Sequence, residues 1–143
     1  MTDKESAAKD WLTRNDWRRN EIRSLELQLE EMRAAVAKMV SPPEEVRVQT
    51  QPKNNAAEKI AEIVDFEKQI EVKRAYYKLL EKTTVETINR LDPTKRILLL
   101  YRYVYHRPWK YIARKMHYTE IYCYELHVKA LNSIYPLIDF AAE

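Results

Sequence analysis

The chain has 143 residues and contains no glycine, which excludes the glycine-rich loops that cradle phosphates in nucleotide-binding enzymes and disfavours tight hairpins. Its abundance of Glu, Lys, Arg, Leu, Ala and Ile favours an all-α fold, while the net charge of +3 says little about partners. A single cysteine excludes an intrachain disulfide, and no apolar run resembles a signal peptide or a membrane span, so we expect a cytoplasmic protein without membrane contact.

The first predicted helix begins between Lys4 and Asp10 and ends before Ser41, because Pro42 and Pro43 cannot continue a helix. Apolar residues repeat along it with alternating spacings of three and four, which is the pattern of a coiled-coil stripe. This stripe consists of Ile22, Leu25, Leu29, Met32, Val36 and Met39. Residues 41–54 contain three prolines and follow no helical period, so they are interpreted as a linker.

A second long helix is predicted over residues 55–91. Its apolar stripe is Ile60, Ile63, Ile70, Tyr77, Leu80 and Thr84, broadened by Val64, Phe66 and Leu79. An amphipathic helix of this length needs a partner. The first helix, folded back as an antiparallel hairpin, would provide one. A dimeric coiled coil is the alternative, which makes residues 20–91 a candidate homodimer interface.

Residues 1–91 are therefore interpreted as two long helices and residues 92–143 as a helix-turn-helix domain. Asp92 is suited to cap the first helix of this domain, with Pro93 at the first helical position. The three helices of the domain are predicted over residues 94–106, 109–116 and 119–134, with Thr119 as the cap of the last.

The last two helices have the spacing of a helix-turn-helix, in which a small residue lies where the helices cross and apolar residues of both face the core. Ala113 is the predicted crossing residue. His117 takes the place where glycine is usual, and histidine tolerates the left-handed conformation that this place requires. The expected core of the pair is Ile112, Met116, Cys123, Leu126, Ala130, Leu131 and Ile134.

Charge is distributed unevenly along the chain. Residues 1–54 hold ten basic and ten acidic side chains, and residues 55–91 hold seven of each. Residues 94–131 hold two acidic side chains (Glu120, Glu125) against eight basic ones, which are Lys95, Arg96, Arg102, Arg107, Lys110, Arg114, Lys115 and Lys129. This segment is therefore the predicted contact surface for a polyanion.

A helix-turn-helix that reads DNA inserts the N-terminal half of its second helix into the major groove. The exposed residues there are expected to be Glu120, Ile121, Tyr122, Tyr124 and Glu125. The two glutamates would accept from cytosine N4, Ile121 would meet a thymine methyl group, and Tyr118, Tyr122 and Tyr124 would face the partner. Contacts to phosphate are assigned to Arg107, Lys110, Arg114, Lys115 and Lys129.

The segment from Leu91 to Leu131 resembles region 4 of bacterial sigma-70 factors. The matching positions are Leu91, Leu99 to Tyr103, Trp109 to Ala113, Met116, Thr119, Cys123, Ala130 and Leu131. Residues 20–135 are also similar to small phage and prophage proteins of Gram-positive bacteria, related to the ArpU and RinA type regulators of late phage transcription. The resemblance implies DNA contacts from Thr119 and the residues after it, a bacterial host cytoplasm, and host RNA polymerase as a further candidate partner.

Two alternatives use the same features differently. The helix-turn-helix would be a protein-binding module that docks on RNA polymerase or a sigma factor without DNA, or the chain would resemble a small terminase subunit of phage packaging. We expect no enzyme activity and no cofactor, because no catalytic constellation or nucleotide fingerprint is present. Cys123 and His127 have the spacing of metal ligands on a helix but lack further ligands, so no metal site is expected.

Overall fold

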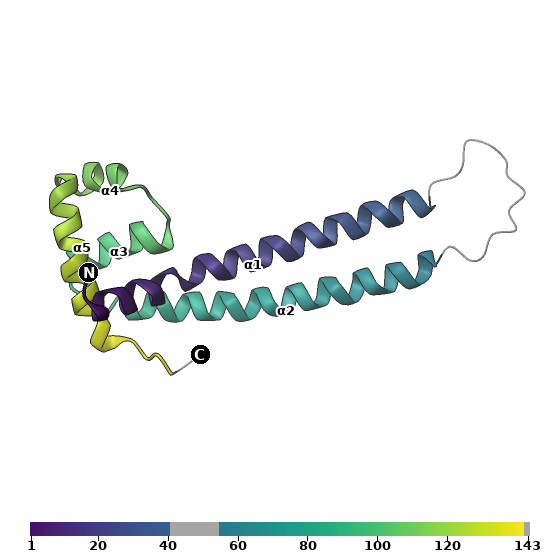
Figure 1. Ribbon diagram of the computed structural model, residues 1–143, viewed down its shortest axis with the longest axis horizontal. Helices are drawn as coiled ribbons and strands as arrows, with labels where there is room; N and C mark the ends of the chain where they lie inside the picture. The colour runs from purple at the N-terminus through teal and green to yellow at the C-terminus, as the bar shows by residue number, and fades with distance from the viewer. Residues whose placement is uncertain (41–54, 142–143) are drawn as a thin grey trace, which may run out of the picture. The chain divides into compact units, whose positions relative to one another are not determined.

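The computed structural model describes residues 1–40 and 55–141 (Figure 1). All regular structure in these two ranges is helical, which confirms the predicted all-α class and its long N-terminal helix. None of the described helices combines the length and apolarity that crossing a membrane requires. The predicted linker at residues 41–54 lies outside the described residues.

The two long helices are α1, Asp3–Val40, and α2, Ala56–Ile88. A capping box begins α1: the backbone N–H of Glu5 donates to the Thr2 hydroxyl (3.2 Å), and the backbone N–H of Thr2 donates to the Glu5 carboxylate (2.9 Å). The helix α2 ends at Ile88, three residues before the predicted end at Leu91. A turn follows, in which the N–H of Leu91 donates to the carbonyl of Ile88 (3.0 Å).

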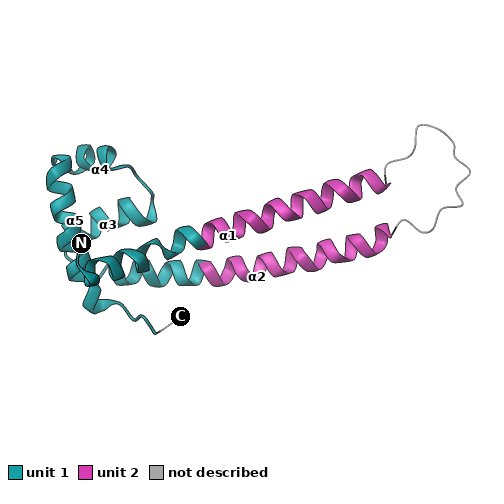
Figure 2. Ribbon diagram, in the orientation of Figure 1, with its two compact units in different colours: residues 1–17, 78–143 teal, residues 18–77 magenta. Residues whose placement is uncertain are grey.

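The described chain divides into two compact units (Figure 2). Unit 1 consists of residues 1–17 and 78–143, and unit 2 of residues 18–77. Both boundaries fall inside the long helices, whereas the sequence-based division was placed between helices, at residue 91. The first turns of α1 and the end of α2 thus belong to the same unit as the C-terminal helices.

Unit 2 is an antiparallel pair of helical segments. Arg33 of α1 bonds Glu67 of α2 (2.7 Å), and the earlier Glu21 bonds the later Lys73 (3.2 Å), which fixes the opposite directions. The predicted hairpin pairing is therefore present. All six residues of the first predicted stripe are buried or half-buried, with Leu29 packed against Ile63 and Ile70 of α2.

The predicted stripe of α2 was too broad. Residues at seven-residue spacing face inward, with Ile63 and Ile70 buried and Tyr77 half-buried in unit 2. Ile60 and Val64, in contrast, are exposed, and so is Leu79 in unit 1. A single partner helix covers only a narrow seam, so apolar residues beside the seam stay in contact with solvent.

Unit 1 has one continuous apolar core. It joins Ala8, Trp11 and Leu12 of α1 to residues from the end of α2 and from the helices that follow. These helices are α3 (Pro93–Leu99), α4 (Trp109–Met116), α5 (Glu120–Ile134) and a short 3₁₀ turn, Tyr135–Leu137. As predicted, Asp92 caps α3 by accepting from the N–H of Lys95 (3.4 Å), with Pro93 at its first position.

The α-helix predicted over residues 94–106 was wrong beyond Leu99, because a π-helical turn, η1, covers Leu100–Val104. The N–H of Tyr105 donates to the carbonyl of Leu100 (2.9 Å), five residues back, and His106 then adopts a left-handed conformation (φ 56°). One contact distant in sequence accompanies this wide turn, since the Tyr103 hydroxyl bonds His127. A local bond closes its end, where Arg102 donates to the carbonyl of Arg107 (3.3 Å).

Candidate functional site

The helices α4 and α5 are joined by a turn of three residues, and His117 determines how α4 ends. His117 is left-handed (φ 61°, ψ 39°), and its N–H donates to the carbonyl of Arg114 (3.3 Å). The next N–H, of Tyr118, donates to the carbonyl of Ala113 (2.9 Å). These two bonds form a Schellman motif, in which histidine occupies the position that glycine usually takes.

Thr119 begins α5, as predicted. Its hydroxyl accepts from the backbone N–H of Tyr122 (3.1 Å), and Glu120 follows in the first turn, where the helix dipole favours a negative charge. The Thr119 hydroxyl therefore caps α5. The DNA contact that the sequence resemblance implies for this residue stays a prediction.

The helices α4 and α5 pack their apolar faces into the core of unit 1, which leaves their other side chains exposed to solvent. The predicted core residues Ile112, Ala113, Cys123, Leu126, Ala130, Leu131 and Ile134 are all buried, and Met116 is half-buried. Cys123 is completely buried, and this burial raises the pKa of its thiol. The cysteine thus serves in packing, and the opposite faces of the two helices are presented to solvent.

The predicted contact residues lie on these presented faces and on the segments flanking them. Of the twelve, only Glu120 is half-buried. The eleven exposed ones are Arg107, Lys110, Arg114, Lys115, Tyr118, Thr119, Ile121, Tyr122, Tyr124, Glu125 and Lys129.

A cluster of cations surrounds the ring of Tyr111, which the sequence analysis did not single out. Arg107, Arg114 and Lys115 place their charged groups 5.5, 5.8 and 5.7 Å from the ring centroid. Such distances allow cation–π attraction. Arg114 and Lys115 lie three and four residues after Tyr111 on α4, the spacing of helical neighbours, and this signal would have found them. Arg107 precedes the helix, so helical spacing does not predict its contact.

The cations of this face differ from those of unit 2 in their partners. In unit 2, Arg33, Lys73 and Arg74 each bond a carboxylate, the last of them that of Glu26. Within the described parts of the chain, none of the five predicted phosphate-contact residues forms an ion pair. The five are Arg107, Lys110, Arg114, Lys115 and Lys129. Their charge is therefore available to an external anion.

The aromatic residues of α5 fall on two edges of its exposed face. Tyr122 packs edge-on against Tyr118 (centroids 4.6 Å apart), and Tyr124 packs edge-on against Trp109 of α4 (5.2 Å). Ile121 has 70% of its surface exposed. The face thus combines an exposed aliphatic side chain, flanking tyrosines and the neighbouring cations.

No protein-family model, curated protein or solved structure matches the chain. The exposed basic and aromatic side chains of α4 and α5 are therefore the features that bear on function.

Proposed function

We propose that the protein is a phage- or prophage-encoded transcriptional regulator that binds double-stranded DNA through α4, the turn and α5 in a bacterial cytoplasm. The observation that carries this proposal is the set of exposed basic side chains on and beside these helices that have no carboxylate partner among the described residues. The resemblance of residues 91–131 to sigma region 4 supports the same function. The resemblance of residues 20–135 to ArpU and RinA type phage proteins suggests late phage genes as its target.

Electrostatics favour a polyanion at this face. Three cations within 6 Å of the Tyr111 ring repel one another, and phosphate groups placed between them would relieve that repulsion. Each phosphate that is neutralised also releases counterions, which makes the affinity strongly dependent on salt. The exposed part of α5, with Ile121 and Glu125, would then supply the contacts to base edges.

Fluorescence anisotropy of the full chain tests the proposal. The titration uses fragments of the source genome at two salt concentrations, with random duplex as competitor. We expect salt-sensitive binding, and Lys110→Ala or Arg114→Ala should weaken it on every sequence and lower the salt slope by about one. Lys82→Ala, which changes an exposed lysine on α2, is the matched control and should leave the slope unchanged. Binding that is absent at low salt, or independent of salt, contradicts the proposal.

A second candidate function is docking on host RNA polymerase or a sigma factor without DNA contact. It is favoured by the exposed patch of Tyr118, Ile121 and Tyr122, because interfaces are enriched in aromatic residues and a free aliphatic side chain gains from burial. Capture of polymerase that survives nuclease treatment and is lost with Tyr122→Ala would support this function. Capture that nuclease abolishes would favour DNA.

We further propose that residues 20–91 allow self-association. Within unit 2, Val64, Val72 and Tyr76 lie exposed on α2, outside the seam with α1, and exposed apolar groups of this kind commonly mark association sites. Light scattering distinguishes the outcomes. A dimer would support self-association of the proposed regulator, and a monomer would contradict self-association. A ring-sized oligomer would favour the terminase-like alternative.

A further inference from the structure

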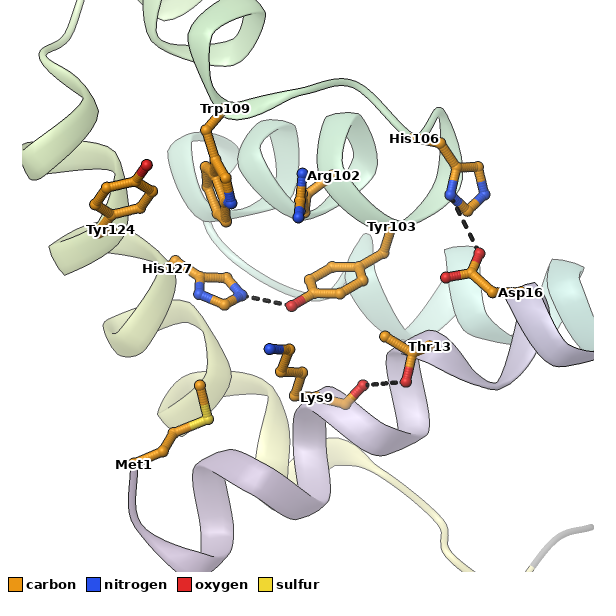
Figure 3. Close-up of a pocket in the computed structure, with 10 residues that line it drawn as sticks. All are labelled: Met1, Lys9, Thr13, Asp16, Arg102, Tyr103, His106, Trp109, Tyr124 and His127. Atoms are coloured by element: carbon orange, nitrogen blue, oxygen red, sulfur yellow. Dashed lines mark hydrogen bonds and ion pairs between the residues drawn. The ribbon is translucent and has the colours of Figure 1, made fainter.

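A cavity of about 380 Å³ lies in unit 1, and Tyr111 is not among the residues that line it (Figure 3). Its walls come from four elements: the first turns of α1, the π-helical turn η1, the beginning of α4, and α5. Ligand pockets span about 300 to 1,000 Å³, so this cavity has the size for a single-ring metabolite or a mononucleotide. A π-helical turn is also a frequent feature of functional sites.

The buried wall of the cavity is a polar pair without charge. The Tyr103 hydroxyl and Nε2 of His127 are 2.5 Å apart, and both side chains are buried. Burial raises the pKa of Tyr103 to about 12 and lowers that of His127 to about 4, so both groups are neutral near neutral pH. The pair therefore supplies hydrogen-bonding capacity without offsetting the charge of a ligand.

Two cations flank this pair, one on each side (Figure 3). The ammonium group of Lys9 extends toward Tyr103 and His127, and the guanidinium of Arg102 lies over the ring of Trp109, 4.7 Å from its centroid (Figure 3). The cavity has one acidic wall residue, Asp16, which already bonds His106 (3.2 Å). Neither Lys9 nor Arg102 forms an ion pair within the described ranges, so the cavity carries uncompensated positive charge.

Aromatic rings form the remaining wall. Trp109 packs edge-on against both His127 (5.0 Å) and Tyr124 (5.2 Å), which fixes the orientation of the indole. Rings held by mutual contact present apolar surface at little entropic cost, and they favour a planar ligand.

We propose that this cavity binds a small organic anion that carries one planar ring system, with its anionic group between Lys9 and Arg102 and its ring against Trp109 and Tyr124. The anionic group is a phosphate monoester or a carboxylate, since both accept from ammonium and guanidinium groups. The site shares Tyr124 with the predicted DNA-facing residues but contains none of the five predicted phosphate contacts. Its occupancy is measured without DNA, so its test is distinct from that of the proposed function.

Calorimetric titration of the full chain with two probes tests the proposal and separates the two anion chemistries. Adenosine 5′-monophosphate carries a phosphate monoester, and indole-3-acetate carries a carboxylate. We expect at least one to bind saturably with a Kd below about 1 mM, while adenosine and inorganic phosphate alone bind at least tenfold more weakly. If neither probe binds saturably, or adenosine binds as well as its monophosphate, the proposal is overturned.

Variants and spectra locate the binding. Lys9→Met should lower the affinity for the tighter-binding probe by about tenfold or more, because a charged hydrogen bond is lost. Lys9→Arg should restore most of that affinity, because it regains a charged donor. Lys38→Met, on an exposed lysine of the same helix, is the matched control. In ¹H–¹⁵N spectra the indole signal of Trp109, assigned with Trp109→Phe, should shift on binding while that of the exposed Trp17 does not. Equal weakening by Lys38→Met, or an unmoved Trp109 signal, would also overturn the proposal.

Discussion

The two units of the chain are built from the same long helices but differ in how much they bury. In unit 1, sixteen buried residues form one cluster that draws on every α-helix of the unit and on η1. Among the described residues of unit 2, only Leu29, Ile63 and Ile70 form a buried cluster, and exposed ion pairs lie beside it. Apolar burial contributes far more to stability than exposed ion pairs do. Unit 1 should therefore unfold globally, whereas unit 2 should open locally at lower free energy.

The largest expected effect is that of truncating the unit 1 core within α1. Leu12 is completely buried, so Leu12→Ala should lower the free energy of unfolding by about 2–5 kcal/mol. Leu27→Ala, on a side chain of unit 2 that is 60% exposed, is the control and should change it by less than about 0.5 kcal/mol. Urea unfolding measures both. Equal effects would mean that the first turns of α1 do not belong to the core of unit 1.

The second effect is a loss of stability in acid that arises in unit 1. Burial, followed by the nearby charges of Lys9 and Arg102, lowers the pKa of His127 from 6.5 to about 4. Between these values the unfolded chain binds a proton that the folded chain does not, so stability falls as the pH falls. The loss between pH 6.5 and pH 4 should be about 3 kcal/mol, and it should be complete below pH 4.

Urea unfolding at about pH 7 and about pH 4, on the wild type and on His127→Gln, isolates this contribution. The carboxylates titrate equally in both proteins, so the wild type should lose about 3 kcal/mol more than the variant between the two pH values. If the two proteins lose the same amount, the imidazole of His127 is not buried in neutral form.

Sequence predicted the parts of the fold that local chemistry specifies. The end of α4 follows from the left-handed His117, and the beginning of α5 follows from its cap, Thr119. The beginning of α3 follows from Asp92 and Pro93. The π-helical turn could not be predicted, because no residue between 94 and 106 marks it and its buried partner, His127, is distant in sequence. The docking of Leu12 in the C-terminal core escaped prediction because its spacing resembles that of any apolar helical stripe.

For the candidate site, sequence reasoning identified exposed residues better than clusters. The exposure of the basic side chains follows from the apolar period of α4 and α5, which was predicted correctly. The positions of Arg114 and Lys115 beside Tyr111 follow from helical spacing, whereas that of Arg107 depends on the turn before α4. The cavity could not be foreseen, since Lys9, Arg102 and His127 come from separate elements and meet only in the tertiary structure.

A smaller effect is expected at the beginning of α5. Thr119→Ala removes the acceptor of the Tyr122 N–H and should destabilise unit 1 by about 1 kcal/mol. Thr119→Ser keeps a hydroxyl at the cap and should restore most of the loss. Thermal unfolding of the three proteins measures the difference. If the serine variant is as unstable as the alanine variant, the methyl group of Thr119 matters rather than its hydrogen bond.

The smallest effect is expected for the ion pairs of unit 2. A double-mutant cycle with Arg33→Ala and Glu67→Ala should give a coupling of about 0.2–1 kcal/mol, because both side chains are largely in water. Amide hydrogen exchange of residues 18–40 and 55–77 is the suitable measurement, since it detects local opening of unit 2. Raising the salt concentration should reduce the coupling further by screening. A coupling above about 2 kcal/mol that resists salt would contradict this account. Such a coupling would require the Arg33–Glu67 pair to be shielded from solvent as strongly as the core of unit 1. The seam between the two helices would then be shielded as well.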